Sequence, residues 1–197
     1  HNVTLYLNSI GCKTCRKEYE KALKKYFEER IDSLCGLCRE RLYKNPMRLL
    51  DCKNDECKKI AAGAPSILDY VCDDCRAHFE KVKELISASG VEFEIDPGIV
   101  RGLDYYTKTV FEFVSDALGA KSTVCGGGRY DGLISELGGN DAPGVGFAVG
   151  IERLLLLMEN SGVKIPEPPK PKVYFAPMGE EGEKIAFGLA FELREKG

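Results

Sequence analysis

The sequence lacks any apolar run long enough to cross a membrane, and it lacks an excess of positive charge. Its longest apolar runs, residues 144–149 and 154–158, are short and are separated by Glu152 and Arg153, whereas a spanning helix needs about 20 apolar residues. Lys and Arg number 28 against 31 Asp and Glu, a formal net charge of -3. Contact with nucleic acid would therefore have to come from local clusters of Lys and Arg. We expect a soluble, cytoplasmic protein without a membrane segment.

The chain also begins without Met, a secretion signal or a flexible lead-in. Residues 3–8 alternate in polarity at once and predict a strand. At the other end, residues 172–176 predict a strand and residues 180–196 a helix, but no second strand of such an α/β unit follows. We therefore expect a piece of a longer polypeptide that ends inside a second domain, with the proline-rich residues 163–171 as a stiff linker.

Cysteine is what the sequence has in abundance, and eight of the nine cysteines form close pairs. In chain order the four pairs are Cys12 and Cys15, Cys35 and Cys38, Cys52 and Cys57, and Cys72 and Cys75; Cys125 stands apart. Two thiolates separated by two to four residues can bind one tetrahedral Zn²⁺, and a second pair completes the site. The four pairs suffice for two structural zinc sites. The absent secretion signal disfavours a disulfide framework, and the paired spacing disfavours free buried thiols.

Spacing alone allows three ways of joining the four pairs in twos. The expected topology favours a nested arrangement, in which the second and third pairs meet at the far end of a helical hairpin. The first and fourth pairs would then meet at its base, where the chain leaves and re-enters the main sheet. Because the helices expected here are too short to be stable alone, the metal would supply folding free energy.

Residues 11–90 predict a small helical insertion that carries these cysteines. Apolar residues at helical spacing between Tyr19 and Phe27 predict a first helix of roughly four turns. We expect Asp32 to cap a second helix, which ends before Pro46, and a third helix to begin near Asp73.

Residues 101–113 combine a charged, aromatic corner with an alternating strand. From Tyr105 onward the strand period predicts one face made of Tyr105, Thr107, Thr109, Phe111 and Phe113, and an opposite face made of Tyr106, Lys108, Val110 and Glu112. Such a strand would lie half in a core and half in a cleft. An edge strand with Arg101 solvated is the plain alternative.

Two glycine-rich segments follow at short range. Three consecutive glycines at positions 126–128 permit the close approach of a ligand or of another backbone, although a strained turn would explain them as well. Neither a Walker loop nor the spacing G-x-G-x-x-G is present. Glycines alternate with apolar residues in 144–149 and predict a strand that runs into a helix. Arg153 would lie in the first turn of that helix, where the macrodipole disfavours a cation, so we expect either an anion nearby or an ion pair with Glu152.

Residues 101–113, 125–132 and 144–154 together resemble the C-terminal half of the catalytic domain of class II histidyl-tRNA synthetases. Residues 101–112 match the histidine-specific signature and residues 144–154 match class II motif 3. The resemblance implies an α+β fold with part of a mainly antiparallel class II synthetase sheet, a cysteine-rich helical insertion and the start of an α/β anticodon-binding domain. The expected ranges are 1–10 and 91–162 for the sheet domain, 11–90 for the insertion and 172–197 for the second domain.

The same resemblance implies the site. Arg101 would bind the histidine carboxylate and the α-phosphate of ATP, stabilising charge as the carboxylate attacks phosphorus. Arg153 would bind the γ-phosphate, which a planar guanidinium can grip with two hydrogen bonds. The histidine pocket would be lined by Arg101, Tyr105, Tyr106, Gly127, Gly128, Tyr130 and Gly146. The flat side of the strand in 144–149 would leave room for an adenine ring. The complete enzyme would use ATP with Mg²⁺, histidine and tRNA(His), and would act as a homodimer.

The sequence departs from the family pattern because motif 1, motif 2 and the earlier carboxylates are absent, so we expect these residues alone to be inactive. One alternative is a synthetase-like regulatory subunit of ATP phosphoribosyltransferase, against which the intact 101–106 corner and the long insertion argue. The other is a zinc-stapled tRNA-binding module whose basic side chains contact backbone phosphates, although a solvated helix face explains those side chains equally well. The basic residues are Lys21, Lys24, Lys25, Arg39, Arg41, Lys44 and Arg48.

Overall fold

The structure is a computed structural model that describes residues 3–100, 105–119, 122–167 and 170–196. The strands are β1 (Thr4–Ser9), β2 (Phe93–Ile95), β3 (Thr107–Ser115), β4 (Ser122–Asp131) and β5 (Pro143–Val149). The α-helices are α1 (Lys13–Glu28), α2 (Gly36–Lys44), α3 (Asp55–Ala62), α4 (Asp73–Ala88), α5 (Leu133–Glu136), α6 (Ile151–Asn160) and α7 (Gly179–Glu195). Short 3₁₀ helices are η1 (Ile31–Ser33), η2 (Pro46–Leu49) and η3 (Ile67–Asp69).

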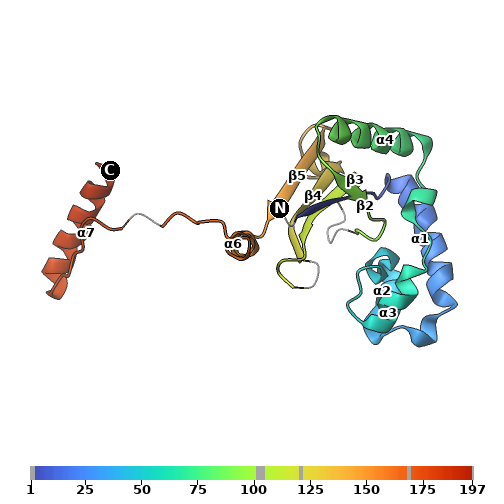
Figure 1. The fold of residues 1–197 in the computed structure, drawn as a ribbon, viewed down its shortest axis with the longest axis horizontal. Coiled ribbons are helices and arrows are strands. Elements are labelled where there is room, and N and C mark those ends of the chain that lie inside the picture. Colours follow the sequence, from blue (N-terminus) through green and yellow to red (C-terminus); the bar gives the residue numbers. More distant parts are fainter. Residues whose placement is uncertain (1–2, 101–104, 120–121, 168–169, 197) are drawn as a thin grey trace. The chain divides into compact units, whose positions relative to one another are not determined.

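The chain divides into two compact units, His1–Lys164 and Ile165–Gly197. The boundary falls inside the range 163–171. The first unit contains a five-stranded sheet with the order β2-β1-β3-β4-β5 (Figure 1). β2 runs parallel to β1, and the other neighbouring strands are antiparallel. The predicted α+β class with a mainly antiparallel sheet is therefore confirmed.

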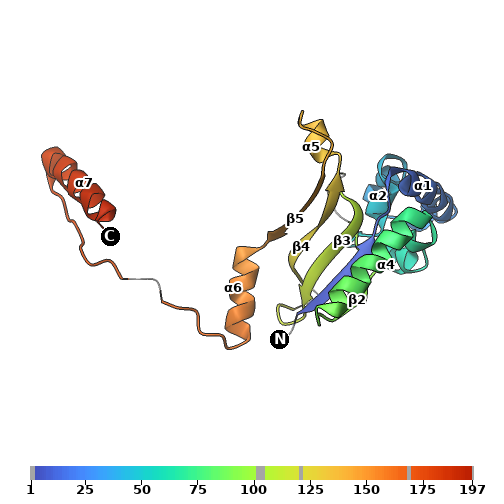
Figure 2. The same ribbon diagram turned by 90° about the horizontal axis from the view of Figure 1, so that it is seen from above.

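Helix α4 covers one face of this sheet (Figure 2). Its Phe79 packs with Leu5 and Leu7 of β1 and with Phe111 and Phe113 of β3. Because side chains alternate along a strand, the residues between these apolar ones point to the opposite face. Burying a side chain of this size stabilises the fold by about 1.5–3 kcal/mol. The α4 contact therefore fixes which strand residues remain for the other face.

The opposite face is built from a second cluster, which we call the tyrosine face. Its buried members are Ile10, Ile99, Tyr106 and Val110, and its partly buried members are Tyr6, Met47, Tyr105 and Tyr130. Met47 belongs to η2 and also packs against the core of the helical insertion. The insertion and the tyrosine face therefore share a packing contact.

Residues 11–90 form a helical lobe with a core of its own (Figure 1). α1 buries Tyr19, Leu23 and Phe27 along one stripe, which confirms the predicted first helix. The hydroxyl of Tyr19 donates a 2.9 Å hydrogen bond to the carbonyl oxygen of Pro65, so the one polar atom of this buried ring is satisfied. The lobe core also contains Leu34, Cys38, Leu42, Leu49, Cys52, Cys57 and Ile67.

The prediction that Asp32 caps the second helix is wrong. Asp32 lies in η1, Leu34 enters the lobe core, and α2 begins only at Gly36 with Cys35 at the N-cap. Arg39 on α2 donates 2.9 Å hydrogen bonds to the carbonyl oxygens of Asp32 and Leu34. These contacts stabilise the turn ahead of the helix, so the helix start moves to the cysteine.

β3 contains a β-bulge between Thr107 and Val110. Lys108 has a φ of 52°, a left-handed conformation that is uncommon for residues other than glycine. The predicted faces hold on both sides of the bulge, because Tyr106, Val110 and Glu112 lie on the tyrosine face and Phe111 and Phe113 on the α4 face. Tyr105 is not on the face predicted for it. It precedes β3 and packs into the tyrosine face with Tyr106, with ring centroids 4.7 Å apart.

The second unit contains α7 and the segment before it. Residues 172–176 form no strand in this part of the described chain, so the strand predicted there is wrong. A strand is held by hydrogen bonds to a neighbouring strand, and Tyr174 is 88% exposed. The helix predicted for 180–196 is present as α7. None of the described helices combines the length and apolar character needed to span a bilayer.

Candidate functional site

Three tyrosines converge on the tyrosine face. Tyr105 and Tyr106 precede β3, and Tyr130 lies on β4. The ring centroids of Tyr105 and Tyr130 are 5.5 Å apart at an interplanar angle of 80°, and those of Tyr106 and Tyr130 are 6.3 Å apart at 73°. Edge-to-face contacts of this kind are favourable for aromatic rings. The structure thus brings together the three tyrosines that the sequence analysis assigned to one pocket.

Glycines make room for these rings. A Cβ atom at Gly128 would lie 2.7 Å from the carbonyl oxygen of Thr109 and 3.0 Å from the ring of Tyr106. A Cβ atom at Gly146 would lie 2.7 Å from the hydroxyl of Tyr130, and one at Gly144 would clash with the same ring. The flat side of β5 is therefore covered by Tyr130 at these two glycines, where the sequence analysis expected room for an adenine ring.

Gly127 is placed differently from its neighbour. It pairs with Phe111 on β3 and with Phe147 on β5, and a Cβ atom there would clash with the carbonyl oxygen of Gly146 and approach Phe147. Successive strand residues point to opposite faces, so Gly127 faces the α4 side. The structure does not bring it onto the tyrosine face with Gly128. The three glycines lie within β4 and not in a strained turn.

Two arginines were assigned to the anionic groups of the substrates. Arg101 lies outside the described residues. Arg153 lies in the first turn of α6, and its Nη1 donates a 2.8 Å hydrogen bond to the carbonyl oxygen of Thr123 on β4. Its side chain is exposed. Arg153 therefore holds the start of α6 against β4 through this hydrogen bond, although the helix dipole disfavours a cation there.

A cavity of 330 Å³ opens on the same face of the sheet and was not predicted from the sequence. Glu112 lines it and accepts a 2.7 Å hydrogen bond from the hydroxyl of Thr123. Lys53 and Asp96 also line it, the former from the insertion and the latter from the loop after β2. The available signal was the carboxylate of Glu112 between two phenylalanines of a strand, since a charged residue in an apolar strand needs a partner.

The eight paired cysteines form two groups of four. Cys12, Cys15, Cys72 and Cys75 make the basal group, and Cys35, Cys38, Cys52 and Cys57 make the distal group. Within each group the sulfur atoms all lie within 4.8 Å of one another. These are the same pairs that the nested arrangement joins. None of the nine cysteines, all of which the structure describes, forms a disulfide, and Cys125 on β4 belongs to neither group.

Each group has dimensions that suit a tetrahedral metal. Four sulfur atoms at about 2.3 Å from Zn²⁺ lie about 3.8 Å from one another. The Sγ atoms of Cys12 and Cys15 are 3.5 Å apart, and those of Cys35 and Cys52 are 3.9 Å apart. Backbone amides also point at the sulfurs, since Cys72 donates to Cys15 Sγ at 3.1 Å. The donor set therefore fits a metal that prefers thiolates.

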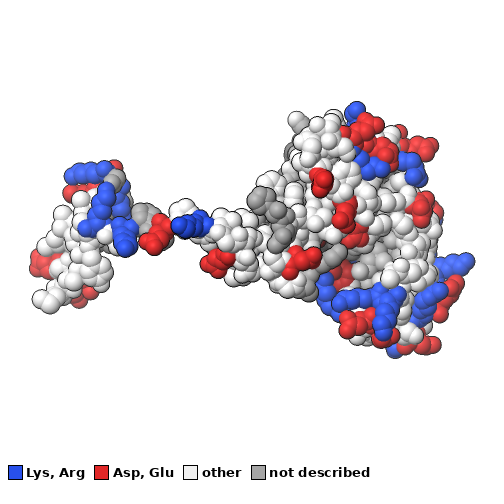
Figure 3. All heavy atoms as spheres, in the orientation of Figure 1, with Lys and Arg blue, Asp and Glu red and all other residues white. Residues whose placement is uncertain are grey.

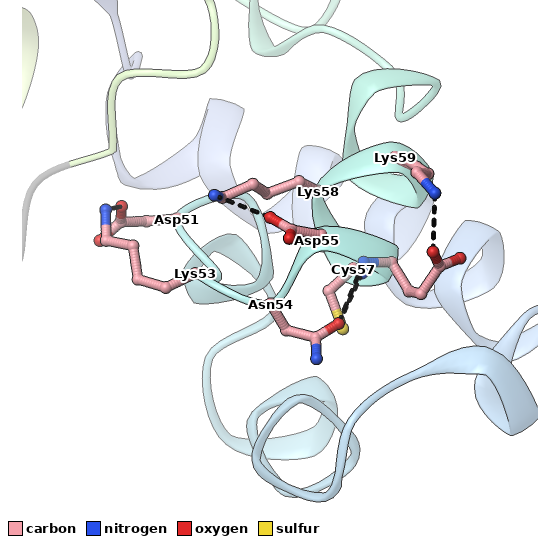
Figure 4. Close-up of polar contacts among 8 residues, drawn as sticks. Asp51, Lys53, Asn54, Asp55, Cys57, Lys58 and Lys59 are labelled. Atoms are coloured by element: carbon pink, nitrogen blue, oxygen red, sulfur yellow. Dashed lines mark hydrogen bonds and ion pairs between the residues drawn. The ribbon is translucent and has the colours of Figure 1, made fainter. Parts of the chain in front are cut away.

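Every pair includes a cysteine at or near a helix start. Cys12, Cys35 and Cys72 are the N-cap residues of α1, α2 and α4. The fourth helix, α3, is capped by Asn54, whose Oδ1 accepts a 3.2 Å hydrogen bond from the backbone N–H of Cys57 (Figure 4). The positive end of a helix dipole stabilises a thiolate. The lobe thus directs several helix dipoles at its sulfur groups.

The thiols of each group resist ionising together. A hydrogen bond from the backbone of Cys15 lowers the pKa of Cys12 from 9.0 to about 6, and one from the backbone of Cys38 lowers the pKa of Cys35 to about 7. Burial raises the pKa of Cys75 and of Cys38. Several thiolates at such short distances repel one another unless a cation lies between them. Full deprotonation of either group therefore calls for a bound metal ion.

Comparisons with known proteins agree on one family. The family model described as histidyl-tRNA synthetase matches residues 13–154. Histidine–tRNA ligases of Acetivibrio thermocellus and Caldanaerobacter subterraneus are 51% and 52% identical over 195 and 197 residues. These alignments cover 99% and 100% of this chain and 47% of each relative.

A crystal structure of apo S. aureus histidyl-tRNA synthetase is similar to the whole chain, with a TM-score of 0.64 and 38% identity, and 48% of that chain is covered. This chain spans about half the length of the curated relatives it matches. The family match includes Tyr105, Tyr106 and Tyr130 and the glycines packed against them. The chain therefore belongs to the histidyl-tRNA synthetase family.

Proposed function

We propose that these residues form the C-terminal half of the catalytic domain of a cytoplasmic, homodimeric histidine–tRNA ligase. The complete enzyme would activate histidine with ATP to histidyl-adenylate and transfer it to tRNA(His). The observation that carries this proposal is the convergence of Tyr105, Tyr106 and Tyr130 over glycines of β4 and β5, in a chain about half identical to histidine–tRNA ligases.

The pocket chemistry suits a small polar amino acid. Tyrosine rings supply flat apolar walls and their hydroxyls supply donors and acceptors, which an imidazole can match with its two nitrogens. Such a site rejects analogues that cannot make the same hydrogen bonds, because its own polar groups would be left unpaired. Tyr105, Tyr106 and Tyr130 would therefore decide specificity, with Gly128 and Gly146 as the floor under the rings and Gly127 as a backbone contribution from β4.

Arg101 and Arg153 would bind the anionic groups of the substrates. In our proposal Arg101 binds the histidine carboxylate and the α-phosphate, and it neutralises the charge that develops as the two react. Arg153 at the start of α6 would grip the γ-phosphate. Mg²⁺ carried by ATP would neutralise phosphate charge. What supports the role of Arg153 is its exposed side chain at the end of the sheet, held by Thr123.

The two alternatives have less support. The two curated relatives named above are histidine–tRNA ligases. For an RNA-binding module, Lys and Arg of the insertion are interspersed with Asp and Glu in the view of Figure 3. Two of these cations are already engaged, because Lys21 pairs with Glu18 at 2.7 Å and Arg39 binds backbone carbonyls. Contact between tRNA and the insertion would be compatible with the ligase function and would not by itself favour a separate RNA-binding module.

We also propose that each cysteine group binds one structural Zn²⁺. The support is the sulfur spacing, the backbone amides directed at the sulfurs, and the raised pKa values of the buried thiols Cys38 and Cys75. No cysteine lies on the tyrosine face, among the members of that cluster that the structure describes. The metal would therefore stabilise the lobe without taking part in the chemistry.

The test of the ligase function uses the complete polypeptide that carries these residues. ATP–pyrophosphate exchange should require histidine, and Arg101→Ala should abolish it while far-UV circular dichroism stays unchanged. Exchange that is driven by another amino acid, or that persists at the normal rate in the variant, would contradict the proposed role. Arg39→Ala is the matched control, since Arg39 donates to the backbone carbonyl oxygens of Asp32 and Leu34 in the helical lobe.

A further inference from the structure

We propose that the basal cysteine group holds the histidine pocket in shape through Arg16, which makes Arg16 a positioning residue for amino-acid recognition. The inference rests on the proposed function and deepens it, because it assigns a task to one of the two metal groups and not to the other. Arg16 would touch neither substrate. It would act on the backbone of Tyr106.

Arg16 directly links the basal group to the aromatic corner. It follows Cys15 in the first turn of α1, and its Nη1 donates a 3.1 Å hydrogen bond to the carbonyl oxygen of Tyr106. The two residues are 90 positions apart in the sequence. A hydrogen bond from a charged donor is stronger than a neutral one and depends on the donor's position. The position of the guanidinium is set by α1, whose start is set by Cys12 and Cys15.

A backbone ladder makes a second link between the same two regions. Ile10 donates to the carbonyl oxygen of Lys108 at 2.8 Å, and the amide of Lys108 donates to Gly11 at 2.9 Å. Gly11 has a φ of +63°, and a Cβ atom there would lie 2.5 Å from Cβ of Cys15. Gly11 is therefore closely packed against Cys15 of the basal group and hydrogen-bonded to Lys108 in the bulge of β3.

Tyr105 and Tyr106 directly precede the bulge and share the tyrosine face. Tyr106 packs against Gly128, and Lys108 follows in a left-handed conformation. A displacement of Gly11 or of Arg16 would act on the two residues that flank Thr107, namely Tyr106 and Lys108. A metal ion that ties α1 to α4 fixes Gly11 and Arg16 together. The basal group is thus connected to the pocket by two independent contacts.

The distal group offers an internal comparison. Its cysteines pack into the lobe core, and the amide of Cys35 donates to Cys57 Sγ at 3.3 Å. Each group should bind its own metal ion. Each also includes an N-cap cysteine that is not fully buried, Cys72 in the basal group and Cys35 in the distal group. Serine at these two positions removes one ligand from each site with a comparable change of chemistry.

The test compares Cys72→Ser, Cys35→Ser, Arg16→Ala, Arg16→Lys and Arg39→Ala in the complete polypeptide. Steady-state ATP–pyrophosphate exchange gives kcat and KM for histidine and for ATP. Calorimetric titration with histidine gives its Kd, and elemental analysis gives zinc per chain. Thermal unfolding reports whether each variant is folded at the assay temperature.

We expect Arg16→Ala to raise KM and Kd for histidine about tenfold, the effect of losing one charge-assisted hydrogen bond. Zinc content and KM for ATP should stay unchanged. Arg16→Lys should recover part of the loss, because an ammonium on a similar stem can still donate to the carbonyl oxygen. Cys72→Ser should lower zinc content and weaken histidine binding, whereas Cys35→Ser should lower zinc content alone. Arg39→Ala should leave histidine binding unchanged.

An unchanged Kd for histidine in folded Arg16→Ala overturns the inference, and so does an equal weakening in Cys35→Ser and Cys72→Ser. A fall in kcat with no change in KM or Kd for histidine would overturn it as well, since that pattern places Arg16 in the chemical step. If the unaltered polypeptide neither exchanges pyrophosphate with histidine nor binds it, the proposed function fails first and the inference fails with it.

Discussion

At the scale of single residues, the absence of a side chain at Gly128 is as informative as the presence of the tyrosines. The atom that a substituent at Gly128 would meet at 2.7 Å is the carbonyl oxygen of Thr109, which belongs to the neighbouring strand. A backbone atom inside a sheet cannot move aside as the end of a flexible side chain can. The close approach of β3, β4 and Tyr106 therefore depends on glycine at this position.

Gly128→Ala should destabilise the first unit by about 1–3 kcal/mol, the usual cost of overpacking. It should also weaken histidine binding, because the ring of Tyr106 has to move. Chemical denaturation and calorimetry measure the two effects. Gly36→Ala is the control, since nothing lies within 4 Å of a Cβ atom there. A stability of Gly128→Ala equal to that of the control would contradict the packing seen here.

His78 on α4 gives a prediction about pH. Burial lowers the pKa of His78, and the nearby positive charges of Arg129 and Lys108 lower it further, while Asp131 opposes them. The unfolded chain then binds more protons than the folded one below about pH 6.5, so the free energy of unfolding falls as pH decreases through that value. His78→Gln should show a smaller loss of stability between pH 7.5 and 5.5 than the unaltered protein. Urea denaturation at both pH values measures the difference, and equal losses would count against it.

At the scale of elements, the accuracy of the sequence-based predictions depended on whether the pattern was local. The stripe from Tyr19 to Phe27 repeats at helical spacing, so α1 could be predicted from the sequence. The bulge at Lys108 could not, because it arises from pairing with Gly11 and with β4, which the polarity pattern of β3 does not contain. The predicted cap at Asp32 failed for a different reason, because the side chain of Arg39 binds backbone carbonyl oxygens of the turn, a contact that polarity does not indicate.

The candidate site shows the same division. Cysteine spacing predicted four pairs, and only the expected topology suggested which pairs meet. The tyrosines and glycines came from a family resemblance, whereas the opposite direction of Gly127 and the cavity beside Glu112 follow from strand register. Register is set by contacts between segments that are distant in the sequence. For that reason the face that Gly127 takes and the position of the cavity could not be predicted, although the carboxylate of Glu112 in an apolar strand indicated a nearby partner.

Removing metal should melt the insertion and leave the sheet. Helices α2 and α3 have only 9 and 8 residues, and short helices are marginal in water without tertiary support. Chelation should therefore reduce helical circular dichroism, while amide hydrogen exchange of β3 and β4 stays slow. Re-addition of Zn²⁺ should restore the signal. Unchanged helicity after complete removal of zinc would show that packing alone holds the lobe.

At the scale of the whole molecule, the chain covers 47% of its curated relatives. The sheet carries large exposed apolar side chains on β5, with Val145 75% and Phe147 70% exposed. The chemistry proposed above therefore belongs to the complete polypeptide.

The 197 residues produced by themselves should fail to catalyse histidine-dependent ATP–pyrophosphate exchange, whereas the complete polypeptide should succeed under the same conditions. Adding a separately purified N-terminal half in equal amount is a useful further arm, because recovered exchange would show that the two halves form one site. Exchange by the 197 residues alone would mean that the residues described here suffice for activation.

The basal group joins two stretches of chain that lie some sixty positions apart, next to Gly11 and next to Val71. The chain between them leaves the sheet and returns beside its point of departure, and Met47 of η2 adds a contact with the tyrosine face. Because this segment lies between β1 and β2, a change in its length would interrupt neither strand.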